Sequence, residues 1–597
     1  MDGIFSLGPF QITFSDGLVS PVGLINPALE VSVLGSQPSR IVWKSKQSDG
    51  PFLQVAYGME VRPPILNGNY QLEERIEQLS YSQSMKINDV TSSKTSLSFS
   101  GKLEKPGADE YDYFFSFSLI PAKPEYFDIS ASQYSLDFSV NVTTKVGSDP
   151  VNRIFLSYWC ETDENFYGFG ESFTYFNLKG RNVPILVSEQ GVGRGIEPLT
   201  TTLNTAVAEG VGGHWYTTYA PKPIYLTNYN RSIFVDQSSV MFFNLTNAAS
   251  SDITIYAWST ALSGTLYLGD SWLDLLQLIT KKTGRQAGKL PSWSQNGAVV
   301  GLEGGTDAVS TIVDTMKAAN VPISGVWLQD WVGMRHSWDG DRLIWNWELN
   351  YDYYPGWQNM IQKWGNDDTR VLTYISPFFS NPANFTNPSE IRNNFYEQGI
   401  KNNYFVRMAD GSPYKMYSLS IEFCMLDPTN PAAREWMKNI IVQQMVIEAN
   451  SSGWMCDFGE YLPFDAYLFS GESPATYHNR YPEDWGAINI AAITEAHNQL
   501  GTRNPDDIVF FMRSAWTKSP TFVPLFWLGD QLVSWDGFDG LQSVITGALS
   551  SGITGQTLTH SDIGGYSVVT DPLMPYYRTP ELLKRWSEFA AFGSGMI

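Results

Sequence analysis

The sequence predicts a β-sandwich followed by a (β/α)8 barrel, an α/β fold whose N-terminal part is all β. Residues 1 to about 265 hold many short alternating segments separated by Gly, Pro, Asn and Asp, which is typical of a sandwich. From residue 291 onward, strand-like runs alternate with helical ones, which favours parallel βα units. We therefore expect a β-sandwich over 1–265, a linker helix over 266–290 and a catalytic barrel with insertions over 291–597.

In the N-terminal part, the alternation is clear at residues 96–100 and 113–119, where every second side chain is apolar. A different pattern stands at residues 166–172, Phe-Tyr-Gly-Phe-Gly-Glu-Ser, which mixes aromatic and polar side chains with glycine. This stretch is compatible with a surface hairpin. It is also compatible with a loop that reaches over a neighbouring domain.

The C-terminal part is predicted to build its barrel from short apolar strands and amphipathic helices. The strand-like runs are residues 297–301, 326–328, 370–375, 453–456, 508–512 and 525–527, and the helical ones include 306–319, 431–448 and 581–591. Long insertions follow two of the strands, over 376–431 and 458–487, where barrels place substrate contacts. Residues 592–597 resemble the start of another strand, so we expect the C-terminal end to be truncated before the barrel is complete.

Bulk composition excludes several classes of function. The formal charge of −22 repels nucleic acid and anionic lipid, and no apolar run is long enough for a membrane span. The spacing of Cys160, Cys424 and Cys456 fits neither a zinc site nor a disulfide scaffold, and no cofactor is indicated. Because the N-terminus lacks the pattern of a signal peptide, we expect a cytoplasmic protein; its oligomeric state stays open.

Two acidic residues follow predicted strands that have the same local sequence pattern. Asp457 ends the run that begins at Ser452, and Asp530 follows Phe526 to Gly529. The carboxyl ends of barrel strands meet at one face, where two carboxylates can flank a glycosidic bond. An apolar wall beside Asp530 would raise its pKa and suit it to the role of the acid. The alternative interpretation for Asp457 is that it caps the next loop or helix.

Other polar residues also follow strand-like runs. Gln329, Asp330, Arg513 and His560 each stand at or after such a run and can donate to or accept from sugar hydroxyls. Taken individually, each is better explained as a structural ion pair or cap. Their common placement at strand ends favours a binding site.

The motifs around these residues resemble those of glycoside hydrolase family 31. The run 454–460, Trp-Met-Cys-Asp-Phe-Gly-Glu, is similar to the nucleophile signature of that family, and 527–530, Trp-Leu-Gly-Asp, to its acid/base signature. Residues 167–171 and 560–565 also match its pattern, and the resemblance covers roughly 150–597. It implies a retaining α-glycosidase built from a β-sandwich and a (β/α)8 barrel.

By this likeness, Asp457 is the nucleophile and Asp530 the general acid/base. Asp330, Arg513 and His560 would line the sugar-binding subsite. The substrate would be a small-molecule glycoside.

A finer resemblance is to the sulfoquinovosidase branch of the family. The residues that carry this resemblance are Gln-Asp-Trp at 329–331, Arg342 and Trp345 on the following loop, and Tyr566 after a Gly-Gly pair. Residues 458–463, which include Glu460, also look like that branch. The resemblance implies hydrolysis of α-sulfoquinovosides such as sulfoquinovosyl glycerol or diacylglycerol.

The residue chemistry agrees with an anionic substrate. A sulfonate stays anionic at physiological pH, so it needs fixed donors: the Arg342 fork, the Trp345 indole and the Tyr566 hydroxyl are such donors. The alternative is that Arg342 pairs with Asp339 or Asp341 on its own loop.

Two departures from the branch bear on the substrate. Glu303 stands near the first predicted barrel strand, where the branch tends to have Gln or Lys; its carboxylate can bind hydroxyls but repels a sulfonate. The family also continues with an eighth strand, a further sugar-binding His and C-terminal β domains. The alternatives to a sulfoquinovosidase are therefore a neutral α-glucosidase or α-xylosidase of the same family, or, more remotely, a non-catalytic carbohydrate-binding relative.

Overall fold

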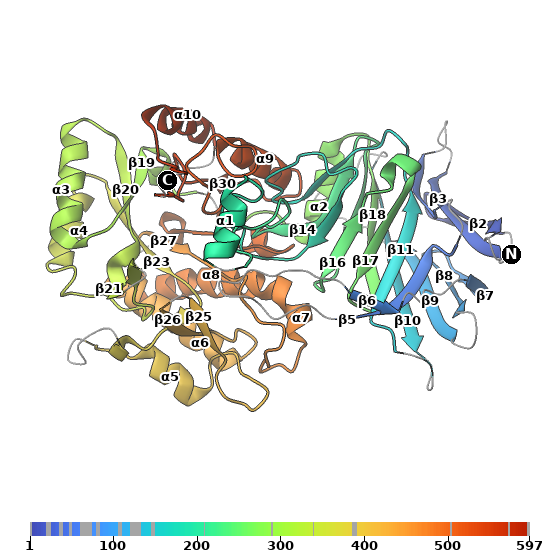
Figure 1. Ribbon diagram of the computed structural model, residues 1–597, viewed down its shortest axis with the longest axis horizontal. Coiled ribbons are helices and arrows are strands. Elements are labelled where there is room, and N and C mark those ends of the chain that lie inside the picture. Colours follow the sequence, from blue (N-terminus) through green and yellow to red (C-terminus); the bar gives the residue numbers. More distant parts are fainter. Residues whose placement is uncertain are drawn as a thin grey trace.

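A computed structural model describes residues 3–593 apart from several internal segments (Figure 1). These segments are residues 20–24, 35–39, 47–49, 60–74, 79–83, 105–109, 120–132, 145–147, 149, 208, 288–289, 338–339, 385–390, 419, 502–503 and 571–573.

The N-terminal part consists of antiparallel sheets. Within the described residues, an eight-stranded sheet has the order β12-β14-β15-β18-β10-β9-β8-β7, a six-stranded sheet β13-β16-β17-β11-β5-β6, and a four-stranded sheet β1-β2-β3-β4. Their strands are β1 (Gly3–Leu7), β2 (Phe10–Val19), β3 (Ile25–Val33), β4 (Ile41–Lys44), β5 (Leu53–Met59), β6 (Arg75–Gln78), β7 (Ser84–Ser92), β8 (Ser96–Glu104), β9 (Glu110–Leu119), β10 (Tyr134–Thr144), β11 (Arg153–Trp159), β12 (Phe166–Gly170), β13 (Asn182–Ile185), β14 (Pro221–Thr227), β15 (Arg231–Val235), β16 (Met241–Asn244), β17 (Asp252–Ala257) and β18 (Ala261–Leu268).

Alternation along the strands explains why these sheets pack together. In β8, Leu97 and Phe99 are buried while the serines between them are half-buried. The rings of Phe99 and Phe115, on adjacent strands, stack with centroids 4.9 Å apart. Buried side chains from all three sheets form one continuous core.

The C-terminal part is built on a parallel sheet with the order β19-β20-β23-β27-β28-β29-β30 among the described residues. Its strands are β19 (Ala298–Leu302), β20 (Ile323–Leu328), β23 (Arg370–Ile375), β27 (Gly453–Cys456), β28 (Val509–Met512), β29 (Leu525–Trp527) and β30 (Thr559–His560). The parallel register brings the residues that follow these strands to one face.

Helices lie in both parts of the chain, and further short elements lie in the long connections of the barrel part. The helices are α1 (Leu199–Ala206), α2 (Trp272–Thr283), α3 (Gly305–Ala318), α4 (Trp357–Gly365), α5 (Phe395–Asn402), α6 (Pro431–Ile440), α7 (Pro474–Tyr477), α8 (Tyr481–Leu500), α9 (Leu541–Gly552) and α10 (Pro580–Ala591). The connections hold a hairpin, β21 (Met334–Ser337) with β22 (Gly340–Leu343), and a sheet of β24 (Phe378–Phe379), β26 (Ile421–Met425) and β25 (Lys415–Ser418).

Helix α6 differs from the predicted single helix over 431–448. It begins at Pro431 behind the Asn430 cap and changes at Ile441 into a π-helix that ends at Glu448. The following strand, β27, leads directly to Asp457.

The two parts of the chain lie side by side, and the N-terminal sheets are in contact with the barrel (Figure 1). Strand β12 is largely buried, and the Ser172 amide beyond it donates to Ser550 Oγ of α9 at 2.9 Å. The stretch 166–172 is therefore not a surface hairpin. The segment between β13 and β14, which contains α1, lies between the two parts and brings Glu189 to the barrel face (Figure 1).

The predicted fold class, antiparallel sheets followed by a β/α barrel domain, is confirmed. Residues 594–597, part of the expected further strand, lie outside the described residues. In the described part of the chain, none of the helices combines the length and the apolar character that crossing a membrane requires.

Candidate active site

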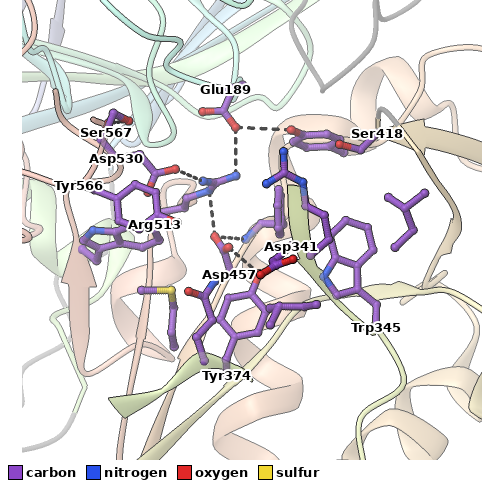
Figure 2. Close-up of a pocket in the computed structure, with 18 of the residues that line it drawn as sticks. Glu189, Asp341, Trp345, Tyr374, Ser418, Asp457, Arg513, Asp530, Tyr566 and Ser567 are labelled. Atoms are coloured by element: carbon purple, nitrogen blue, oxygen red, sulfur yellow. Dashed lines mark hydrogen bonds and ion pairs between the residues drawn. The ribbon is translucent and has the colours of Figure 1, made fainter. Parts of the chain in front are cut away.

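A cavity of about 550 Å³ opens at the face where the parallel strands end (Figure 2). It is lined by residues that follow β20, β27, β28 and β29, by the β21–β22 hairpin and by the segment that begins at Glu189. Eight of the predicted site residues, all of them described, line it: Glu303, Gln329, Arg342, Trp345, Asp457, Arg513, Asp530 and Tyr566. The fold thus gathers residues that lie more than 260 positions apart in the sequence (566 − 303 = 263).

Arg513, directly after β28, is the centre of the charge network. Its guanidinium lies within 2.5–3.2 Å of four carboxylates in the described part of the chain: Glu460 at 2.5 Å, Glu189 at 3.0 Å, Asp457 at 3.1 Å and Asp530 at 3.2 Å. Figure 2 shows the guanidinium between Asp530, Glu189 and Asp457. The two predicted catalytic carboxylates therefore share one cation, which brings them to the same cavity.

One cation does not offset four buried carboxylates, and the pKa values reflect this. Burial raises the pKa of Asp530 well above its usual range, Glu189 and Asp457 raise it further, and Arg513 opposes the rise. Burial raises the pKa of Glu460 to about 8, against the pull of Arg513. The cluster therefore retains protons at neutral pH, and Asp530 is the most accessible of the four carboxylates, with 27% of its side chain exposed against 17% for Glu189.

Asp457 has the donors that a nucleophilic carboxylate needs. Its Oδ2 accepts from the Tyr374 hydroxyl at 2.7 Å, and its Oδ1 accepts from the Phe458 amide at 2.8 Å. Burial raises the pKa of Asp457, while Arg513, Tyr374 and the Phe458 amide oppose that rise by favouring the ionised form. Phe458 has a positive φ of 61°, which turns the chain sharply at the strand end.

Asp530 is held by its backbone neighbours. Gly529 has φ +86°, and a Cβ there would lie 2.3 Å from Tyr219 Cε2, so only glycine allows the backbone to approach this closely. The Ser567 hydroxyl donates to the Asp530 carbonyl at 3.0 Å. The amides of Tyr566 and Ser567 donate to the Gln531 carbonyl at 2.8 Å and 2.9 Å. The loops that carry Asp530 and Tyr566 are thus joined.

The β21–β22 hairpin carries positive charge into the cavity. Arg335 and Arg342 are directly opposed in its antiparallel register and both line the cavity. Like charges directly opposite one another are unfavourable, and an anion bound between or beside them relieves that repulsion. Asp341, one of the two alternative partners proposed for Arg342, pairs with His336 at 2.5 Å; the other, Asp339, lies outside the described residues.

Trp345 follows the hairpin and is fixed by aromatic neighbours. Its ring contacts those of Phe423, Phe378 and Phe458, with centroids 5.0 Å, 5.2 Å and 6.0 Å away. Its backbone N–H donates to Ser380 Oγ at 3.1 Å. The indole therefore has a fixed orientation at the cavity wall.

Three of the predicted residues are buried beside the cavity and do not line it. Asp330 accepts from the Gly304 amide at 2.8 Å and from the Tyr354 hydroxyl. Glu460 pairs with Arg513. His560 packs edge-on against Phe511, and among the described residues neither of its ring nitrogens has a hydrogen-bond partner. Burial lowers the pKa of His560 to about 3, so its imidazole is neutral.

Glu303 lines the cavity as an exposed side chain at the end of β19. Burial of its carboxyl and the charges of Asp330 and Asp341 raise its pKa. Glu303 and Asp341 thus place negative charge near the arginines of the hairpin.

The sequence reasoning missed Glu189, Arg335 and Tyr374. Glu189 comes from the N-terminal part, and only the packing of that part on the barrel brings it to Arg513. Tyr374 lies inside β23 and not after the strand end, which is the position that marks the other candidates. Arg335 stands near Arg342 in the sequence, but only the β21–β22 hairpin of the structure brings the two opposite one another.

Comparison with known proteins finds relatives of this chain. Residues 291–596 match the model described as the glycosyl hydrolases family 31 TIM-barrel domain. The chain is 35% identical over 468 residues to the sulfoquinovosidase of Escherichia coli (strain K12), covering 78% of this chain and 65% of that one. It is 34% identical over 444 residues to the sulfoquinovosidase of Agrobacterium fabrum, covering 74% and 63%. The chain thus spans about two thirds of the length of these two curated relatives.

A solved structure from the same family is also similar to this chain. A GH31 family sulfoquinovosidase from E. rectale, in complex with the aza-sugar inhibitor IFGSQ, aligns with a TM-score of 0.80 at 30% identity. That alignment covers 95% of this chain and 77% of the other.

Proposed function

Because the chain belongs to glycosyl hydrolase family 31, we propose that it hydrolyses α-sulfoquinovosides with retention of configuration. The observation that carries the proposal is one cavity that joins two carboxylates, Asp457 and Asp530, to a cationic hairpin that bears Arg342. The relatives named above, two curated proteins and one solved structure, are called sulfoquinovosidases, which supports the same substrate class.

In the first step, Asp457 attacks the anomeric carbon while Asp530 gives its proton to the glycosidic oxygen. The bond to the aglycone breaks and a glycosyl ester of Asp457 forms. In the second step, Asp530 takes a proton from water, the water oxygen attacks the anomeric carbon, and Asp457 leaves as a carboxylate. Two displacements return the α-anomer.

The environment of the two acids suits these roles. Tyr374 and the Phe458 amide favour the ionised form of Asp457, and the raised pKa of Asp530 keeps its proton available. The excess of carboxylates over the Arg513 cation stabilises the positive charge that develops at the anomeric carbon.

The anionic group of the substrate needs a different cation. Arg513 is surrounded by four carboxylates, so its positive charge is already paired with theirs. Arg342 and the opposed Arg335 line another part of the cavity and supply positive charge with fixed donor geometry. Gln329, Trp345 and Tyr566 line the same cavity and add neutral donors.

A second candidate is a neutral α-glucosidase or α-xylosidase, and the observation in its favour is Glu303. A carboxylate on the cavity wall binds sugar hydroxyls well and repels a sulfonate. Because burial, and then the charges of Asp330 and Asp341, raise the pKa of Glu303, its neutral form is more accessible than for an isolated Glu. That neutral form can donate to a sulfonate oxygen, so Glu303 is compatible with both substrates.

The proposal is tested by comparing kcat/KM for 4-nitrophenyl α-sulfoquinovoside, α-glucoside and α-xyloside. We expect the sulfoquinovoside to be preferred by at least about 100-fold, with Asp457→Asn as the inactive control. Proton NMR of the first-formed sugar should show the α-anomer. Preference for the glucoside or xyloside would overturn the substrate class, and a β-anomer would overturn the mechanism.

A further inference from the structure

We propose that Arg194 and Asp539 form an interdomain clamp that positions Asp530 for proton transfer. Arg194 belongs to the segment between β13 and β14 of the N-terminal part. Asp539 ends the loop that carries Asp530, directly before α9. The inference rests on the proposed function, because it assigns these two residues to the acid step of that reaction.

Asp539 holds together the loop that carries Asp530. It is fully buried, and its Oδ1 accepts from the Leu532 amide at 3.0 Å, two residues from Asp530. Its carbonyl accepts from the Ser534 hydroxyl at 2.5 Å. One side chain therefore fixes the loop shape immediately after the acid.

The N-terminal part binds the same carboxylate of Asp539. Asp539 Oδ2 accepts from the Gly193 amide at 2.7 Å, and Arg194 Nη2 lies 3.2 Å from Asp539 Oδ1, with both side chains fully buried. Arg194 Nε also donates to the Phe538 carbonyl at 2.9 Å, and Nη2 donates to Ser543 Oγ at 3.2 Å. A buried pair with this many fixed donors sets geometry more than it adds net stability.

A further contact lies closer to the acid. Gln531, the residue after Asp530, donates from Nε2 to Gln190 Oε1 at 3.1 Å and to the Leu528 carbonyl at 2.7 Å. Gln190 and Arg194 belong to the same segment of the N-terminal part, so this segment holds the Asp530 loop on both sides. A small shift of a proton donor relative to its acceptor is costly in rate.

The distinguishing readout is the dependence on the leaving group. Nitrophenolate leaves without a proton, whereas the alkoxide of a glyceryl glycoside needs one from Asp530. In Arg194→Met, we expect kcat/KM for α-sulfoquinovosyl glycerol to fall about 100-fold, and kcat/KM for 4-nitrophenyl α-sulfoquinovoside to fall less than about fivefold. Asp539→Asn and Arg194→Lys should show the same discrimination to a smaller degree, and they keep the test available if Arg194→Met does not fold.

Arg231→Met is the matched control. Arg231 forms a buried ion pair with Glu164 inside the N-terminal sheets, remote from the Asp530 loop. It should lower the Tm without changing the ratio of the two kcat/KM values. Equal losses for both substrates in the Arg194 and Asp539 variants, or the same discrimination in Arg231→Met, would overturn the clamp.

Failure of the clamp and failure of the proposed function are distinguishable. If the wild-type protein cleaves neither sulfoquinovoside but cleaves glucosides, the substrate proposal fails. The clamp is then tested with methyl and 4-nitrophenyl α-glucoside, and the same two outcomes decide it.

Discussion

At the scale of single residues, Arg513 decides the electrostatics of the cavity. Four carboxylates around one guanidinium cannot all ionise without a large cost in a buried site, so the cluster titrates as a unit. Asp457, Glu460 and Asp530 all have raised pKa values, and the donors to Asp457 oppose the rise by favouring its anion. This difference in donors agrees with the proposed roles of Asp457 as nucleophile and Asp530 as acid.

The first prediction concerns Glu460 and the pH dependence of stability. Its folded-state pKa of about 8 lies above the unfolded value of about 4.3. Its contribution to stability is therefore fully present below the unfolded pKa and is lost as pH rises through about 8. Glu460→Gln stays neutral, so the decrease in free energy of unfolding between about pH 5 and about pH 9 should become smaller.

Urea unfolding at a series of pH values measures this decrease. Glu209→Gln, at an exposed position, is the control and should behave as the wild type. An unchanged pH dependence in Glu460→Gln would show that Glu460 is ionised in the folded protein.

Among the residues, those next to a strand end could be predicted from the sequence, and those fixed by tertiary contacts could not. Asp457, Arg513 and Asp530 each follow an apolar run, so their common face follows from the fold class. Glu189 also comes shortly after an apolar run, at 183–187, but that run belongs to the N-terminal part of the chain. Its place at Arg513 depends on how two separately predicted parts of the chain dock.

At the scale of elements, the loop after β29 sets the position of Asp530. Strand β29 is short and buried, and Gly529, the second residue of the loop, cannot be replaced by another residue without strain. The sequence predicts this strand but not that Tyr219 packs against Gly529. It does not predict the β21–β22 hairpin, which is short and lacks a strong apolar pattern, nor the change of α6 to a π-helix, which side-chain periodicity does not reveal.

The second prediction is that Gly529→Ala is more costly than the same change at an open glycine. Its added methyl would meet the Tyr219 ring at 2.3 Å and the backbone would stay at φ +86°. We expect a loss of about 2–4 kcal/mol in free energy of unfolding and a large fall in kcat/KM.

Gly471→Ala is the matched control, because Gly471 has φ +74° with open space around it. It should cost only about 1 kcal/mol, from backbone strain alone. Equal costs at the two positions would mean that Tyr219 moves away freely, and the tight packing behind Asp530 would not hold.

At the scale of the whole molecule, the N-terminal sheets contribute to the active site. The N-terminal part supplies Glu189. Gln190, which contacts Gln531, and the clamp residue Arg194 come from the same segment. A second junction lies at His478 and Asn479, which bind the backbone of Val187 from the barrel side. The sequence predicts the two folds but not this dependence of one on the other.

The third prediction concerns that junction. Asn479 is fully buried; its Oδ1 accepts from the Val187 amide at 2.8 Å, and its Nδ2 donates to the Ser238 carbonyl at 3.1 Å. Asn479→Ala leaves these backbone groups without their partner, so we expect a loss of about 2–4 kcal/mol in free energy of unfolding. Asn498→Ala, at an exposed position of α8, should stay within about 0.5 kcal/mol of the wild type. A wild-type value for Asn479→Ala would mean that water replaces its hydrogen bonds.

The central claim is that Arg342 selects an anionic sugar for the carboxylate pair. It is tested most directly by the ratio of kcat/KM for 4-nitrophenyl α-sulfoquinovoside to that for the α-glucoside, in the wild type and in Arg342→Met. Arg585→Met, on the exposed side of α10, is the control. We predict that Arg342→Met lowers the sulfoquinovoside value at least about 100-fold and changes the glucoside value less than about threefold, because only the sulfonate loses a charge-assisted partner. A sulfoquinovoside value within about threefold of the wild type would contradict the claim.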